Sequence, residues 1–138
     1  MTYTVVAHIK RKTGTTPEQF RNYYDTVHIP LLMSLVGPTF PLTHTRNYVT
    51  RKPKDLLDPN TKFEPIMYMG EATSVEYDSL TVMVWEDKAA FDRFAERFYS
   101  KEVHEKMTED EKNFADPAPR VIYAIEEPRV TKRGETLG

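Results

Sequence analysis

Four segments of the chain are rich in β-branched and apolar residues, and each segment carries apolar residues on both of its faces. Such segments are typical of strands that are covered on both sides. The pattern predicts strands at residues 3–10, 43–50, 78–86 and 120–126. A short additional strand, or a piece of pocket lining, is expected at 65–69.

A helical pattern separates the first two strands. Thr16, Pro17 and Gln19 form an N-terminal capping signature with proline in the first turn, so a helix is predicted to begin here. Pro30 lies inside this helix and removes one backbone hydrogen bond, which predicts a kink just after His28. The side chains at helical spacing predict a buried stripe of Phe20, Tyr24, Val27, Leu31 and Leu35.

Further helices are predicted between the third and the last strand. Asp87 is expected to cap the first of them, and a second begins near Ser100. Thr108 and Glu111 have the spacing of another capping box, which predicts a last short helix through Phe114. The residues expected to face inward are Phe91, Phe94, Ala95, Phe98, Val103 and Met107.

This order of elements predicts an α+β domain of the ferredoxin-like βαββαβ type, with an antiparallel sheet and its helices on one face. The domain is expected to span residues 1–127, with a long loop insertion at 51–74 and a polar C-terminal tail at 128–138. The tail is interpreted either as disordered or as an arm that reaches a partner. Because the other face of the sheet is also apolar, two sheets are expected to pack face to face in a homodimer.

The length of 138 residues fits one domain with one modest core. A chain of this size cannot enclose a large cavity alone, so a sizeable pocket is expected to depend on a partner subunit.

Composition narrows the possible functions. The formal net charge of −2 argues against nucleic-acid binding, and the absence of cysteine excludes disulfides and thiolate chemistry. No apolar segment approaches the length of a membrane span, and the first residues lack a signal-peptide layout, so a cytoplasmic protein without a membrane partner is expected. The spacing of histidines and acids favours no metal site, and no glycine-rich phosphate loop supports a nucleotide cofactor. The expected chemistry is acid–base catalysis without a cofactor, or binding alone.

Histidines are the first candidates for such chemistry, because their side chains titrate near neutral pH. His28 precedes the proline kink next to Tyr24 and Asp25, and it either points into a cavity mouth or is a satisfied, half-buried residue. His8 either lines a pocket or packs beneath a helix, depending on which face of its strand is inside. His44 begins the second strand and is either a pocket residue or an exposed strand end.

Aromatic side chains are frequent for a chain of this length. Tyr48, Trp85 and Tyr123 lie on predicted strands, where they could stack against a flat ligand, although core packing explains most aromatic residues. Tyr68, in the long loop insertion, is a further candidate hydrogen-bond donor.

Several short motifs, in their order and spacing, resemble the EthD domain family over about residues 3–127. The motifs in the first part of the chain are Lys10-Arg11-Lys12-x-Gly14, Pro17-Glu-x-Phe20, Tyr24 and His28-x-Pro30-Leu31. Those in the second part are Tyr77-Asp78, Ala90-Phe91, Asp110-Glu111-x-x-Phe114-x-Asp116 and Glu126-Glu127.

The resemblance implies a ferredoxin-like fold, a dimeric α+β barrel and no cofactor. Fungal members of the family often accompany polyketide synthases and are described as cofactor-free lyases, namely decarboxylases, dehydratases or cyclases of aromatic polyketide intermediates. Other proteins with the same barrel include polyketide cyclases and cofactor-independent monooxygenases. His28 matches the recurring histidine of the family, whereas the 51–74 insertion differs among members.

The leading hypothesis is a cofactor-independent lyase that acts on a hydrophobic, aromatic polyketide-like intermediate of secondary metabolism. His28 and His8 are the candidate acid–base residues, and Asp25 is a residue that could orient a histidine. Tyr24 completes the catalytic set as a hydrogen-bond donor. The predicted substrate-binding residues are Tyr48, His44, Tyr68, Trp85 and Tyr123. The alternatives are a cofactor-free monooxygenase on the same barrel and a non-catalytic protein that binds a small ligand.

Overall fold

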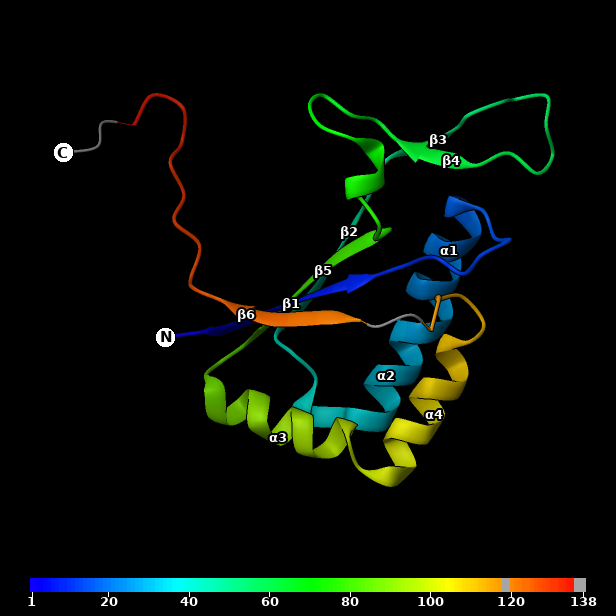
Figure 1. Ribbon diagram of the computed structural model, residues 1–138. Helices are drawn as coiled ribbons and strands as arrows, with labels where there is room; N and C mark the ends of the chain where they lie inside the picture. The colour runs from blue at the N-terminus through cyan, green and yellow to red at the C-terminus, as the bar shows by residue number, and fades with distance from the viewer. Residues whose placement is uncertain (118–119, 136–138) are drawn as a thin grey trace.

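The structure is a computed structural model of the chain that describes residues 1–117 and 120–135 (Figure 1). Its elements in chain order are β1 (Tyr3–Ile9), α1 (Pro17–Tyr23), a π-helical turn (Tyr24–His28), α2 (Ile29–Val36), a 3₁₀ turn (Gly37–Thr39), β2 (Thr43–Tyr48), β3 (Arg51–Pro53), β4 (Phe63–Pro65), a 3₁₀ turn (Ala72–Ser74), β5 (Ser79–Trp85), α3 (Lys88–Phe98), α4 (Lys101–Glu111) and β6 (Val121–Ile125).

Four of the strands form one antiparallel sheet in the order β2-β5-β1-β6. The helices α1 to α4 lie together on one side of this sheet (Figure 1). The predicted α+β, ferredoxin-like architecture is therefore confirmed.

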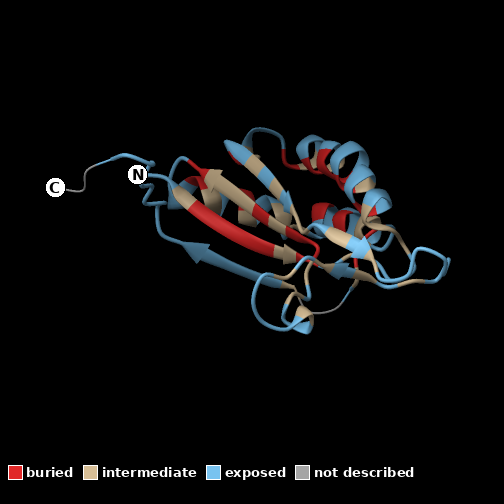
Figure 2. Cartoon of the chain, turned by 90° about the horizontal axis from the view of Figure 1, so that it is seen from above, coloured by how far each residue is buried: buried red, intermediate tan, exposed pale blue. Residues whose placement is uncertain are grey.

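The two faces of the sheet have different surroundings. Val5, Ala7 and Ile9 of β1 belong to the buried core together with residues of the helices. Figure 2 shows buried positions inside the sheet and an exposed strand along its edge. On the opposite face Val6 lies between Val82 of β5 and Tyr123 of β6. The strand β6, at the edge of the sheet, exposes its apolar residues on both of its faces.

The first helix begins with the predicted capping box. The Oγ1 atom of Thr16 accepts a hydrogen bond from the Gln19 amide at 3.1 Å, and the Gln19 side chain accepts one from the Thr16 amide at 2.9 Å. The predicted disturbance beside His28 takes the form of a π-helical turn, in which the amide of Ile29 donates to the carbonyl of Tyr24. Pro30 is tolerated because it lies in the first turn of α2.

The π turn corrects the predicted buried stripe. A π turn contains one more residue than an α turn, so the inward face moves one position along the chain. Val27 is consequently 42% exposed, and Leu31 and Leu35 are only half-buried. The side chains buried on this helical segment are Phe20, Tyr24, His28, Ile29, Leu32 and Val36.

The prediction of a separate short helix beginning at Thr108 is wrong. The helix α4 continues without a break from Lys101 to Glu111, so Thr108 lies inside it. Val103 and Met107 are buried as predicted, and this inward face continues past Thr108. Packing of that continuous face outweighs the local capping pattern.

The long insertion forms a hairpin of β3 and β4, and β4 shares only Pro65 with the short strand predicted at 65–69. Arg51 attaches this hairpin to the domain by donating to the carbonyls of Val75 and Tyr77, both at 2.9 Å, and by an ion pair with Asp78 at 2.6 Å. Tyr68, by contrast, is 96% exposed.

The tail beyond β6 contains no helix or strand between residues 126 and 135, and it extends away from the domain (Figure 1). Near its beginning, the Glu127 side chain accepts a hydrogen bond from the Thr2 amide at 2.9 Å. Residues 136–138 of the predicted tail, and 118–119 of the proline-rich stop before β6, lie outside the described residues.

Candidate functional site

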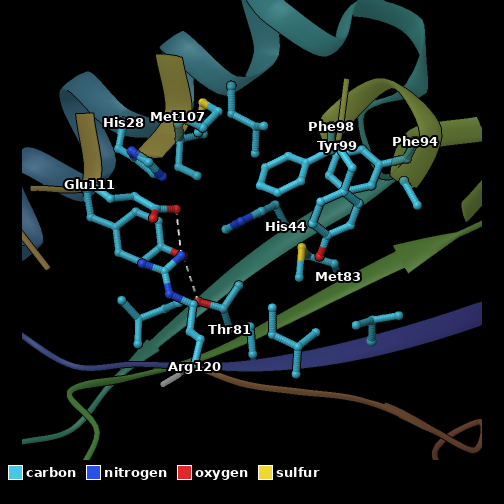
Figure 3. A pocket seen from close by; sticks show the side chains of 18 of the residues that line it. His28, His44, Thr81, Met83, Phe94, Phe98, Tyr99, Met107, Glu111 and Arg120 are labelled. Carbon is cyan, nitrogen blue, oxygen red and sulfur yellow. Dashed lines mark hydrogen bonds and ion pairs between the residues drawn. The ribbon is translucent and has the colours of Figure 1, made fainter. Parts of the chain in front are cut away.

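A cavity of about 100 Å³ lies between the helices and the face of the sheet that they cover (Figure 3). An engineered apolar cavity of roughly 150 Å³ is large enough for benzene, so this one has room for about one ring at most. Most of the cavity wall is apolar and includes Val5, Ile29, Leu32, Trp85, Phe94 and Met107.

The cavity lies within one chain. It is therefore not the pocket between two paired sheets that the chain length and the open face suggested. Ala7 of β1 and Ala95 of α3 each contribute only a methyl group to its wall, so they leave space between the sheet and the helices.

The cavity reaches the protein surface beside α3 and β6. Of its lining residues there, Tyr99 is 62% exposed and Ile122 is 49% exposed. Arg120 and Glu111 form an ion pair of 2.6 Å at the same cavity, between the start of β6 and the end of α4. A ligand that enters here meets charged groups as well as an apolar interior.

His28 lies in the cavity wall, on the π turn and in contact with α4. Its Nδ1 atom lies 2.8 Å from Oδ2 of Asp110, and its ring points into the cavity (Figure 3). The other oxygen of Asp110 accepts a hydrogen bond from the Tyr23 hydroxyl at 2.7 Å. Because a carboxylate only accepts hydrogen bonds, Nδ1 of His28 carries the proton.

Burial lowers the pKa of His28 below its ordinary value, although Asp110 and Glu111 act in the opposite direction. His28 is therefore neutral near pH 7, with an unprotonated Nε2 atom. Among the described residues, no hydrogen-bond donor contacts this Nε2 atom. A neutral imidazole that a carboxylate orients in this way is suited to accept a proton from a ligand.

His44 enters the cavity from β2, in register with Met83 of β5. Its Nδ1 atom lies 2.9 Å from Nη1 of Arg46. Burial, and next the charge of Arg46, lower the pKa of His44 to about 4. His44 is therefore also neutral near pH 7.

Tyr24 lies on the floor of the same cavity. Its hydroxyl is 2.9 Å from Oγ1 of Thr81, which in turn lies 3.0 Å from Oγ of Ser79. Burial raises the pKa of Tyr24 to about 12. The tyrosine therefore stays protonated near neutral pH and can act as a hydrogen-bond donor, but not as a base.

The structure brings together some of the residues that the sequence singled out. His28, Tyr24, His44 and Trp85 all line the cavity. The indole N–H of Trp85 donates to the carbonyl of Thr39 at 3.0 Å. This N–H group is therefore occupied, and Trp85 contributes only apolar surface to the cavity wall.

Two further predicted residues lie just outside the cavity. The Tyr48 hydroxyl donates to Asp25 at 2.5 Å, and Asp25 also pairs with Arg46 at 2.7 Å. Burial raises the pKa of Tyr48, and its contact with Asp25 adds to this effect. Asp25 therefore orients Arg46, the residue that contacts His44.

The remaining predicted residues lie elsewhere. His8 and Tyr123 are on the opposite face of the sheet, where Nε2 of His8 is 2.9 Å from the Tyr123 hydroxyl and the His8 ring is 4.4 Å from that of Tyr77. Tyr68 projects into solvent from the insertion. These three candidates do not reach the cavity in one chain.

Sequence reasoning missed Asp110, Glu111 and Arg120 as site residues. Asp110 and Glu111 follow Met107 by three and four positions, so they continue the inward face of α4. That spacing is a usable signal for the two acids. Arg120 had none, since its side chain reaches the cavity only through the pairing of β6 with β1.

The described residues contain neither a candidate metal cluster nor a helix that could span a membrane. Within them, no group of three or more histidine, cysteine, aspartate or glutamate side chains is arranged to hold a metal ion. Their helices are all too short or too polar to cross a bilayer.

A four-stranded antiparallel sheet with helices on one face and a cavity between them defines a ferredoxin-like α+β protein. The chain belongs to the EthD family, because the model of the EthD domain matches residues 12–118.

Solved structures share this fold at low sequence identity. An EthD-like protein from Ralstonia eutropha has a TM-score of 0.58 and 14% identity, with 91% of this chain and 90% of the other covered. An ethyl tert-butyl ether D (EthD) family protein from Bacillus halodurans has a TM-score of 0.55 and 15% identity, with 93% and 100% covered. No curated protein matches the sequence.

Proposed function

We propose that this protein is a cofactor-independent lyase for an oxygenated, aromatic polyketide-like molecule. The observation that carries the proposal is the pairing of Asp110 with a buried, neutral His28 whose Nε2 atom is free toward an apolar cavity. An apolar pocket with a few converging polar groups is the usual form of a small-molecule site. The reaction is a decarboxylation, a dehydration or a cyclisation.

All three reactions need a base beside an acidic C–H or O–H group. In a dehydration, Nε2 of His28 takes the proton next to a ketone, and the C–H electron pair forms an enolate. The enolate then expels the hydroxyl group at the neighbouring carbon as water, using the proton that His28 returns. In a decarboxylation, Nε2 of His28 takes the proton of the substrate carboxyl group, the C–C bond to the resulting carboxylate breaks and CO₂ leaves, and the enolate takes that proton back from His28. Asp110 stabilises the imidazolium in both cases.

The ion pair at the cavity edge supplies a further contact. A guanidinium has five N–H donors, and the hydrogen bond from Arg120 to Glu111 uses only one of them. The others suit a carboxylate or phenolate of the substrate. Because the cavity holds about one ring, the rest of a larger substrate extends past Tyr99 and Ile122 into solvent.

The test is turnover of aromatic β-keto acids and β-hydroxy ketones, followed by mass spectrometry with and without oxygen. The His28→Ala variant should lose activity by about 100-fold or more. His104→Ala, which changes an exposed histidine of α4, is the matched control and should retain it. Unchanged turnover in His28→Ala removes His28 from the mechanism. Turnover that requires oxygen supports a monooxygenase instead, and binding without any chemical change supports an accessory protein.

We also propose that the protein acts as a homodimer in the form of an α+β barrel. The open face of the sheet carries Val6, Val82, Val121 and Ile125, and the last two are exposed in the single chain. Burial of such a face against a second copy is favourable. The proposed setting is the cytoplasm, where the protein would act in secondary metabolism, in a fungal polyketide pathway. A polyketide synthase gene beside the gene of this protein would support this setting.

A further inference from the structure

We propose that His44 is the hydrogen-bond donor for a carbonyl or enolate oxygen of the ligand, and that Arg46 and Asp25 are positioning residues that keep its proton on Nε2. This inference rests on the proposed function, because it assigns the oxygen subsite of the same cavity. It also specifies the ligand class: a carbonyl compound that can form an enol or enolate.

The contact between Arg46 and His44 determines where the imidazole proton lies. Nη1 of Arg46 is 2.9 Å from Nδ1 of His44. A guanidinium has only donors and keeps its charge at all working pH values, so Nδ1 of His44 must accept. A neutral imidazole carries one N–H group, and that group is therefore on Nε2.

Arg46 is itself held in place from several sides. Its Nε atom lies 2.7 Å from Oδ1 of Asp25, and its Nη1 also approaches the His44 carbonyl at 3.3 Å. The guanidinium lies over the ring of Tyr24, 5.8 Å from the ring centre. Asp25 accepts a second hydrogen bond from Tyr48 at 2.5 Å. A chain of contacts thus runs from Tyr48 through Asp25 and Arg46 to His44.

The two cavity histidines are held as opposite tautomers. Asp110 keeps the proton of His28 on Nδ1, which leaves Nε2 as an acceptor, whereas Arg46 keeps the proton of His44 on Nε2. Both rings point into the same space (Figure 3). One imidazole therefore takes a proton while the other donates a hydrogen bond to the oxygen that becomes negative. A donor that is aligned in advance is an effective way to stabilise such an oxyanion.

The protonation state of His44 agrees with this role. The groups that act on it are Arg46, which disfavours a second proton, Asp25, which favours one, and the nearby His28. Burial is the largest influence, and its pKa is about 4. His44 is thus a constant, neutral donor near pH 7.

The first test reads the position of the proton directly. Nitrogen-15 NMR of histidine-labelled protein should show His44 with its proton on Nε2 over the range from pH 6 to 8. In Arg46→Met, which lacks the donor, the two tautomers should mix and the pKa of His44 should rise. Arg46→Lys, which restores a donor, should recover the Nε2–H form, and the exposed His104 serves as an internal reference. A proton on Nδ1 of His44 in the unchanged protein overturns the inference.

The second test measures the oxygen subsite without turnover. Acetophenone and ethylbenzene have similar size, but only acetophenone has an acceptor oxygen. Acetophenone should bind more tightly, and His44→Phe should reduce its affinity by about 3- to 10-fold, as expected for one hydrogen bond. The affinity for ethylbenzene should hardly change. His44→Gln, which keeps an N–H donor, should restore part of the preference.

These outcomes separate the inference from the proposed function. If acetophenone binds no more tightly than ethylbenzene, or if both lose affinity equally in His44→Phe, then His44 only contributes surface to the cavity and the proposed donor role is overturned. A clear acetophenone preference with no turnover of any β-keto substrate supports the subsite and contradicts the lyase. Circular dichroism of each variant confirms that the fold is retained.

Discussion

Asp110 on α4 accepts a hydrogen bond of 2.8 Å from Nδ1 of His28 on the π turn, across 82 positions of the sequence. This contact links the two segments that close one side of the cavity. It also fixes the direction of the His28 ring and leaves Nε2 toward the ligand.

Replacing the carboxylate should impair the base without removing it. In Asp110→Asn, the amide no longer holds the His28 proton on Nδ1, so we expect turnover to fall by about 10- to 100-fold. Since Asp110 raises the pKa of His28 against the effect of burial, its loss should lower this pKa further. The measurement is kcat against pH. Glu109→Gln, an exposed change on the same helix, is the control, and an equal loss there would contradict the role of Asp110.

The acidic limb of the pH profile should report His28. Its pKa is lowered from 6.5 by burial, and the neutral form is the active base. Activity is therefore present above the lowered pKa and is lost as the pH falls through it. The midpoint of kcat/KM on the acid side should lie below 6.5, and a midpoint above 6.5 would contradict a buried, neutral base.

The free energy of unfolding should depend on the protonation of His44 between about pH 4 and pH 6.5. The pKa of His44 is about 4 in the folded chain and 6.5 in the ordinary state, so the unfolded chain binds more protons between these values. The stabilising effect of a neutral His44 is complete above about pH 6.5 and is lost as the pH falls toward 4. Relative to His44→Gln, the wild type should lose up to about 3 kcal/mol of unfolding free energy between pH 7 and pH 4. Urea unfolding at both pH values measures the difference, and a constant difference would contradict the prediction.

Filling the cavity should block the ligand without damage to the polar groups. Ala95 of α3 lines the cavity, so Ala95→Leu should weaken acetophenone binding by about 10-fold or more because part of the space is taken. Its melting temperature should stay within a few degrees of the wild type, since overpacking a half-open site is mild. Ala89→Leu, exposed on the same helix, is the matched control. Equal binding in both variants would show that ligands bind elsewhere.

The open face of the sheet should decide the oligomeric state. Val121 is 51% exposed on β6, and Val121→Lys should convert a dimer into a monomer because the charge cannot be buried at low cost. Analytical ultracentrifugation measures the change. Leu57→Lys, in the exposed insertion, should leave the dimer intact. A wild-type protein that stays monomeric at high concentration would contradict the proposed barrel.

Local signals in the sequence determined much of the fold. The capping box of Thr16 and Gln19, the cap at Asp87 and the apolar pattern of β1 and β5 were all predicted correctly. These features depend on neighbouring residues, whose spacing can be read directly from the chain. The order of elements then led to the ferredoxin-like fold, and the motifs around His28 led to the EthD family, which the domain match confirms.

Only the tertiary structure decided which candidates share a site. His8 and His28 were both candidate acid–base residues in the sequence, but pairing with β6 places His8 on the open face, while the π turn and α4 place His28 in the cavity. Likewise, the tautomer of His44 depends on its contact with Arg46, which Asp25 holds in place from a different element. Strand register and helix packing join residues that are distant along the chain, and no local spacing encodes those distances. The sequence therefore determined the elements and the family, whereas the cavity and its two complementary histidines are products of the folded chain.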